Sequence, residues 1–103
     1  MLVLRCSDLE ISKAFYEKLG FCFEQEQHGN GPVHYASDEN GFVFELYPAK
    51  EGETDRTRVG FEISGLGEKL AHFESYDTYE YHGMQIPIIT DPDGRKIELY
   101  DRQ

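Results

Sequence analysis

The pattern G-x-x-x-E-L-Y occurs twice in the chain, at residues 41–47 and 94–100, about half a chain apart. A shared E-L-Y alone could arise by chance. A glycine at the same offset and the half-chain spacing are what an internal duplication predicts. With 103 residues, the chain is long enough for one domain only. The sequence therefore predicts a single domain over residues 1–103, built from two related halves that end in equivalent strands.

The first half has the predicted element order β-α-β-β-β. Ser7 and Glu10 stand at the spacing of a helix capping box, and Gly20 suits the residue that follows a helix. Residues 38–41, Asp-Glu-Asn-Gly, are a hairpin signal. The predicted elements are a strand over 1–6, a helix over 8–19 whose apolar face carries Ile11, Ala14, Phe15 and Leu19, and strands over 21–27, 33–37 and 42–47.

The second half repeats this order less clearly. Residues 50–57 are polar and charged, and they predict a linker between a first module over about 1–49 and a second over about 58–103. Residues 75–82 are aromatic and acidic, and we interpret them as a loop that could include a short strand, so the second module is degenerate. The other predicted elements are strands over 58–64, 85–90 and 95–100 and a short helix over 66–73, with a tight Asp-Pro-Asp-Gly turn at 91–94.

The composition excludes several partners. Twenty acidic residues against ten basic ones give a net charge of −10, which argues against nucleic acid and anionic membranes and is compatible with a cationic small ligand. No apolar run reaches the roughly 18 residues of a membrane span, and the N-terminus lacks the layout of a signal peptide. Cys6 and Cys22 are predicted to be free thiols. We therefore expect a cytoplasmic protein that binds neither nucleic acid nor membranes.

Alternation along the strands separates an apolar face from a polar one. The apolar faces suit packing against a helix, whereas the opposite faces carry Glu45 with Tyr47, Arg58, and Glu98 with Tyr100. One interpretation is a solvated sheet surface. The duplication favours another, in which the two halves join edge to edge and bring Glu45 and Glu98 toward each other.

The order of four segments resembles the vicinal oxygen chelate superfamily, which is also called the glyoxalase/bleomycin resistance protein/dioxygenase family. Residues 8–21 are close to its D-L-x-x-S-x-x-F-Y-x-x-x-L-G-F pattern, and residues 91–99 are close to D-P-D-G-x-x-I-E-L; residues 44–46 and 58–63 close the first module and open the second. The resemblance implies an α+β fold of two βαβββ modules that form a curved mixed sheet with a cleft, with helices on its outer face. It also implies a homodimer.

Members of that family that use a metal hold it at four positions, which correspond here to Met1, Glu45, Arg58 and Glu98. The glutamates match a glyoxalase I-like metalloenzyme, but a guanidinium has no lone pair for a metal, and a thioether suits these metals poorly. We therefore expect no cofactor. If a divalent metal is held, Glu45 and Glu98 are the expected ligands. We further expect Arg58 to replace the ion by pairing with Glu45, Glu98 or both.

Histidines and tyrosines add further candidates. His34, in a predicted strand, could face the cleft as a replacement ligand, and ordinary packing or exposure is the alternative. Surface roles are expected for His28, His72 and His82. Tyr47 and Tyr100 could form the floor for a flat cationic ligand. The tyrosines of the acidic loop, Tyr76, Tyr79 and Tyr81, could line the same site, cover the end of the sheet or make a dimer contact.

The preferred function is that of a metal-independent binder of a small, cationic, aromatic molecule. Its predicted cleft residues are Glu45, Tyr47, Arg58, Glu98 and Tyr100. The first alternative is a divergent metal-dependent lyase or isomerase of the glyoxalase type, in which Glu45, Glu98 and unexpected further ligands hold the metal. Separately, Glu45 and Glu98 are the catalytic candidates as a general acid/base pair, with a structural salt bridge to Arg58 as the other interpretation. The second alternative is a non-catalytic interaction protein. The sequence leaves open whether the chain is an enzyme.

Overall fold

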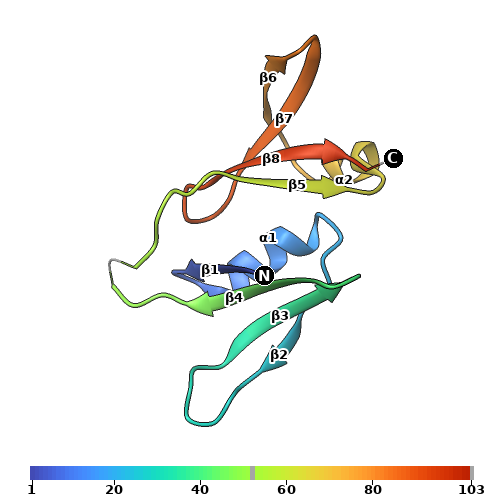
Figure 1. Cartoon of the computed structure of the whole chain (residues 1–103). Helices are drawn as coiled ribbons and strands as arrows, with labels where there is room; N and C mark the ends of the chain where they lie inside the picture. Colours follow the sequence, from blue (N-terminus) through green and yellow to red (C-terminus); the bar gives the residue numbers. More distant parts are fainter. Residues whose placement is uncertain (52, 103) are drawn as a thin grey trace.

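Two βαβββ modules, each with its own four-stranded mixed sheet, make up the fold (Figure 1). The computed structural model describes residues 1–51 and 53–102. The strand orders are β1-β4-β3-β2 and β5-β8-β7-β6, and in each sheet the first and last strands of the module pair in parallel. The elements are β1 (Leu2–Cys6), α1 (Leu9–Glu17), β2 (Glu24–Glu26), β3 (His34–Glu39), β4 (Phe42–Pro48), β5 (Val59–Ile63), α2 (Leu66–Leu70), β6 (Asp77–Tyr81), β7 (Met84–Thr90) and β8 (Lys96–Asp101).

The predicted α+β class and the two modules are confirmed, and the second module is complete. The stretch interpreted as a loop contains β6, which pairs with β7 in antiparallel fashion and places Tyr79 opposite Ile86. In the first module, β2 is shorter than predicted because Phe21 and Phe23 pack in the aromatic core instead of continuing the strand. Neither of the two helices described is long and apolar enough to cross a membrane.

The start of α1 differs from the predicted capping box. Asp8 is the N-cap, and its carboxylate accepts a hydrogen bond of 3.1 Å from the backbone N–H three residues on. Ser7 instead donates from its hydroxyl to Asp93 in the second module, and Glu10 accepts from the hydroxyl of Tyr35. The capping-box prediction is therefore wrong, because both side chains are used for contacts with other elements.

The buried face of α1 is also shifted from the predicted one. Ser12 and Tyr16 are fully buried, whereas the side chain of Ile11 is 56% exposed. The hydroxyl of Tyr16 donates a 2.6 Å hydrogen bond to Asp91. The aromatic ring can therefore lie in the core while its polar end is satisfied, a solution that apolar spacing alone does not indicate.

The apolar faces of the two sheets share one aromatic core. The rings of Phe44 on β4 and Phe61 on β5 lie 5.3 Å apart between centroids. Tyr16 packs edge-on against both, at 5.1 Å and 6.2 Å. Accordingly, α1 lies between the two sheets (Figure 1). The polar strand faces therefore point away from this core.

A buried polar cluster fixes the second module onto the first. Arg95 is 1% exposed, and it donates to Asp91 at 3.1 Å and to the carbonyl oxygen of Arg5 in β1. The other oxygen of Asp91 accepts from the backbone N–H groups of Asp93 and Arg95, both at 2.9 Å. Tyr16 of the first module donates to the same carboxylate. The Asp-Pro-Asp-Gly segment therefore forms the predicted tight turn and also connects the two modules.

Replacing Tyr16 by phenylalanine should lower the free energy of unfolding by about 1.5–3 kcal/mol, because Asp91 loses a buried hydrogen bond. The matched control is Tyr35→Phe, which removes an exposed hydrogen bond from the Tyr35 hydroxyl to Glu10. It should lower the free energy of unfolding by less than about 0.5 kcal/mol. Urea denaturation of both variants measures the difference. Equal losses in the two variants would contradict a structural role for the buried cluster.

Candidate functional site

Glu45 of β4 and Glu98 of β8 lie in different sheets and have different partners. The residues flanking each glutamate are buried in the shared core, so strand alternation turns both carboxylates away from it. Glu45 is 3.7 Å from the ring of His34, whereas Glu98 is 3.3 Å from Arg58. Within one chain, Arg58 therefore pairs with one of the two glutamates only.

The Glu98 side of the structure is a group of three polar side chains. Arg58 Nε lies 3.3 Å from one oxygen of Glu98, and a second guanidinium nitrogen donates to the other oxygen at 3.4 Å. Tyr79 also donates to Glu98, and its ring lies 5.5 Å below the guanidinium. The hydrogen bond from Tyr79, followed by that from Arg58, holds the pKa of Glu98 below its ordinary value. This face therefore stabilises an anionic Glu98 without a metal.

Strand register explains how these groups come together. Glu98 stands opposite Gly60 of β5 on one side and Ile88 of β7 on the other. A side chain at residue 60 would meet the ring of Tyr100 at 3.4 Å, so the glycine leaves room for that ring. Hydrogen bonding to Glu98, and then to Tyr100, raises the pKa of Tyr79. The predicted Arg58, Glu98 and Tyr100 thus lie close together on the second sheet.

The Glu45 side is built around His34, the first residue of β3. The imidazole is 1% exposed and stacks on the ring of Tyr47 at 4.1 Å, with 9° between the planes. Arg5 lies 4.9 Å from the same tyrosine ring. Of the two outcomes weighed for His34, the structure shows burial next to Glu45. Tyr47 packs against a histidine and an arginine, and Tyr100 lies in the other sheet.

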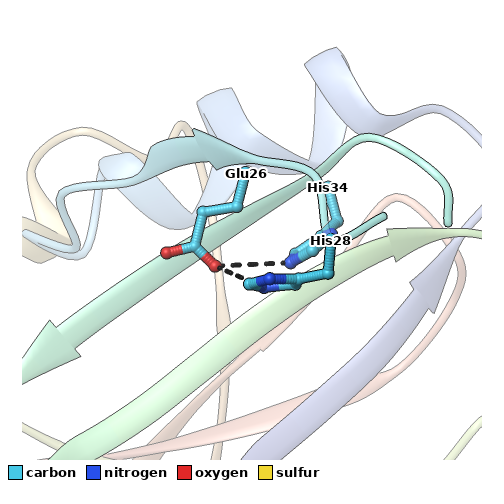
Figure 2. Close-up of side chains that lie close together, drawn as sticks. All are labelled: Glu26, His28 and His34. Carbon is cyan, nitrogen blue, oxygen red and sulfur yellow. Dashed lines mark ion pairs between the residues drawn. The ribbon is translucent and has the colours of Figure 1, made fainter. Parts of the chain in front are cut away.

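Glu26 and His28 extend this group at the β2–β3 hairpin (Figure 2). Glu26 Oε1 lies 3.3 Å from His28 Nε2 and 3.4 Å from His34 Nε2. One ligand atom from each of the three residues falls within 4.8 Å of the others, so the group could hold a metal ion. The side chain of His28 is 73% exposed, in agreement with its predicted surface location.

An acidic cavity of about 450 Å³ lies on the polar face of the first sheet. Four carboxylates line it together with an exposed free thiol, an alanine and a valine: Glu24, Glu26, Asp38, Glu45, Cys22, Ala36 and Val43. No arginine or lysine is among the described residues that line it. A second cavity, of about 400 Å³, lies at the junction of the modules, and its lining includes none of the predicted site residues.

The four positions that the family resemblance assigns to a metal do not fit one here. Met1 is 85% exposed at the end of the chain, and Arg58 occupies the carboxylate of Glu98. Glu45 lies in the other sheet beside His34. A guanidinium at a ligand position offers no electron pair and repels a dication.

Sequence reasoning missed Glu26, named Tyr79 only as one of three loop tyrosines that could line the site, and treated His28 as an ordinary surface residue. Tyr79 falls in the stretch interpreted as a loop, although the alternation in Asp-Thr-Tyr-Glu-Tyr over residues 77–81 is typical of a strand. Glu26 and His34 are direct partners in the β2–β3 pairing. The predicted strands over 21–27 and 33–37, with a turn between them, already imply this register, which was the signal that could have identified Glu26.

Comparison with known proteins agrees with this architecture. The sequence profile of the Glyoxalase/Bleomycin resistance protein/Dioxygenase superfamily matches residues 1–77. The chain is 29% identical to Uncharacterized protein YwkD of Bacillus subtilis (strain 168) over 120 residues, which cover 98% of this chain and 94% of YwkD.

Two solved structures share the fold and are named for different roles. Oxidase ChaP-H2 is 18% identical, with a TM-score of 0.75 over 100% of this chain and 94% of its own. TnmS3, an antibiotic binding protein from Streptomyces sp. CB03234, is 20% identical, with a TM-score of 0.70 over 99% of this chain and 93% of its own. At these identities the likeness concerns the fold and not the activity. From its sequence profile and its two βαβββ modules, the chain belongs to the Glyoxalase/Bleomycin resistance protein/Dioxygenase superfamily.

Proposed function

We propose that the protein binds a small cationic organic molecule in the acidic cavity of the first sheet, and that binding needs no metal at the four positions known from the family. The observation that carries this proposal is the lining of the cavity: four carboxylates and, among the described residues, no basic side chain. The volume of about 450 Å³ lies within the range of small-molecule sites.

Electrostatics favours a cation over an anion in this cavity. Four carboxylates on one concave face generate a negative potential, and the net charge of −10 adds to it at longer range. The structural likeness to TnmS3, described as an antibiotic binding protein, is consistent with a role in binding. The paired Arg58 and Glu98 favour binding over a metal-dependent lyase or isomerase, because the guanidinium takes the place of an ion.

The second sheet supplies the aromatic part of the proposal. Tyr79 and Tyr100 lie beside Glu98 on its polar face, and their rings would contact a flat ligand, although Arg58 covers one face of the Tyr79 ring. The polar faces of the two sheets do not meet within one chain, so we propose that they meet across a homodimer. In that arrangement Glu45 of one protomer and Glu98 of its partner border one cleft.

Unpaired strand edges and exposed apolar side chains support the homodimer. β1 and β5 each form one edge of a sheet in the described structure. Met1, Val3 and Met84 are exposed by 85%, 37% and 58%. A second copy could cover these groups and extend the sheets.

A cationic planar dye such as ethidium should bind the purified protein, whereas an anionic naphthalene sulfonate of similar size should not. Glu24→Gln and Asp38→Asn should each weaken binding by up to about fivefold, because each removes one attractive charge. Fluorescence titration at low and high salt measures both effects. The control is Glu68→Gln on α2, away from the cavity; equal weakening there, or tighter binding of the anionic dye, would contradict the proposal.

Tyr79→Phe should raise the pKa of Glu98, because the hydroxyl is the strongest influence that lowers it. The stability that an anionic Glu98 contributes is present at neutral pH and is lost as the pH falls through its lowered pKa. In the variant this contribution should be smaller, and its loss should be complete at a higher pH. Carboxyl NMR titration and acid unfolding check the prediction, and Tyr81→Phe on the same strand is the control. An unchanged titration of Glu98 in Tyr79→Phe would refute it.

Sedimentation equilibrium should give a molar mass close to twice that of the chain if the two polar faces meet across a homodimer. Val3→Glu places a charge on the exposed face of β1. It should shift the protein toward monomer, because burying this unpaired carboxylate in the interface would cost free energy. Ile11→Glu, at an exposed position of α1, is the matched control. A monomeric mass for the unmodified protein at high concentration would rule out the homodimer.

A further inference from the structure

The group formed by Glu26, His28 and His34 has a defined origin in the β2–β3 hairpin. Glu26 and His34 are paired residues at the end of the two strands, so their side chains emerge next to each other. The loop between them folds back through hydrogen bonds from Gln27 to the carbonyl of Gly31 and from Gly31 to the carbonyl of His28, both 3.0 Å long. This loop conformation brings the His28 ring beside Glu26 and His34 (Figure 2).

His34 presents its ring nitrogen in the form that a metal needs. Nδ1 lies 3.2 Å from the carbonyl oxygen of Pro32, which can only accept, so the proton of the neutral ring belongs on Nδ1. Nε2 then carries the lone pair. This atom is buried and has no hydrogen-bond partner among the described residues. A backbone carbonyl on the far nitrogen is the usual second contact of a metal-binding histidine.

The surroundings of Nε2 favour a positive charge, which either a proton on the ring or a bound metal ion supplies. Its two nearest charged atoms are Glu26 Oε1 at 3.4 Å and Glu45 Oε2 at 3.7 Å. A lone pair directed at two carboxylate oxygens is repulsive, and burial strengthens that repulsion. A dication between these groups would convert three mutually unfavourable acceptors into ligands and would balance the charge of the two carboxylates.

Two of the three distances between the ligand atoms agree with metal coordination. Bonds of roughly 2.0–2.2 Å around a tetrahedral ion place neighbouring ligand atoms roughly 3.3–3.6 Å apart. The separations of Glu26 Oε1 from His28 Nε2 and His34 Nε2 are 3.3 Å and 3.4 Å. Two imidazoles and a carboxylate are a donor set for zinc and neighbouring divalent transition metals, whereas calcium and magnesium prefer oxygen ligands only.

We propose that Glu26, His28 and His34 bind a divalent first-row transition-metal ion, with Glu45 as the second carboxylate beside it. This site lies within the first module and uses neither Arg58 nor Glu98, so it differs from the four positions known from the family and from the expectation that the chain holds no metal. Three protein ligands leave a coordination position for water or for an oxygen or nitrogen of a bound molecule. The site borders the acidic cavity, because Glu26 and Glu45 also line it.

Zinc binding to the chelator-treated, dialysed protein tests this proposal. Competition with a chromophoric chelator should show about one equivalent of Zn²⁺ per chain. His28→Ala and His34→Gln should each weaken the affinity on the order of 100-fold or more, since loss of a ligand exceeds loss of its supporting contact. Imidazole ¹⁵N NMR should show zinc-dependent shifts of Nε2 in His28 and His34, and no such shift in His72 or His82.

Two matched variants show whether zinc binds at these three residues or elsewhere on the chain. His72→Gln removes an exposed histidine in the turn after α2 and should leave zinc affinity unchanged, as should Glu98→Gln. The proposal is overturned if the protein binds no zinc, or if Glu98→Gln weakens binding while His28→Ala does not. The His28 ring lies on an exposed loop, so this variant decides the question even if His34→Gln fails to fold.

The dye-binding test of the proposed function remains separate from the zinc test. Glu24→Gln and Asp38→Asn change two carboxylates of the cavity outside the metal ligands. They should weaken dye binding and leave zinc affinity within about twofold, because they contribute only long-range charge. Zinc binding without dye binding would support the metal site and contradict the proposed function. Dye binding without zinc binding would support the proposed function and contradict the metal site.

Discussion

The contact on which the rest of the structure depends is the buried cluster of Asp91, Arg95 and Tyr16. A buried ion pair is costly unless hydrogen bonds satisfy both partners. Here the donors come from the helix of the first module and from the turn of the second, and the guanidinium also reaches the backbone of β1. The cluster can be satisfied only when the modules are correctly placed. It therefore fixes the Phe44–Phe61 contact and, through it, the direction of both polar faces.

Local chemistry was sufficient to predict the fold, because each strand carries a clear apolar face and the two halves repeat the same order. Phe44, Leu46, Ile97 and Leu99 are buried as their alternation indicates. The errors concern side chains that serve distant partners. Ser7 is a residue type typical of a helix N-cap, but its hydroxyl donates to Asp93 instead. Tyr16 can be buried because its hydroxyl donates to Asp91, a carboxylate distant in the sequence. Such contacts depend on tertiary structure and leave no local signal.

The candidate site was only partly predictable for the same reason. The pairing of Arg58 with Glu98 follows from two parallel strands whose residue types are evident in the sequence. On the Glu45 side, His34 was a candidate for the same face, but Glu26 and His28 join it through the register of a three-residue strand and the path of a hairpin loop. The two halves thus keep the same glutamate in the same strand and surround it differently: a guanidinium and a phenol in one, an imidazole in the other.

The placement of His28 in a short hairpin loop has an evolutionary consequence. Strands in the middle of a sheet tolerate few changes, because each alters packing on both faces, whereas loops accept substitutions and changes of length at little cost in stability. A coordinating imidazole carried by such a loop can be gained or lost without disturbing the scaffold. Descendants of one duplicated ancestor could in this way acquire, relocate or abandon inorganic chemistry while their hydrophobic interior remains unaltered.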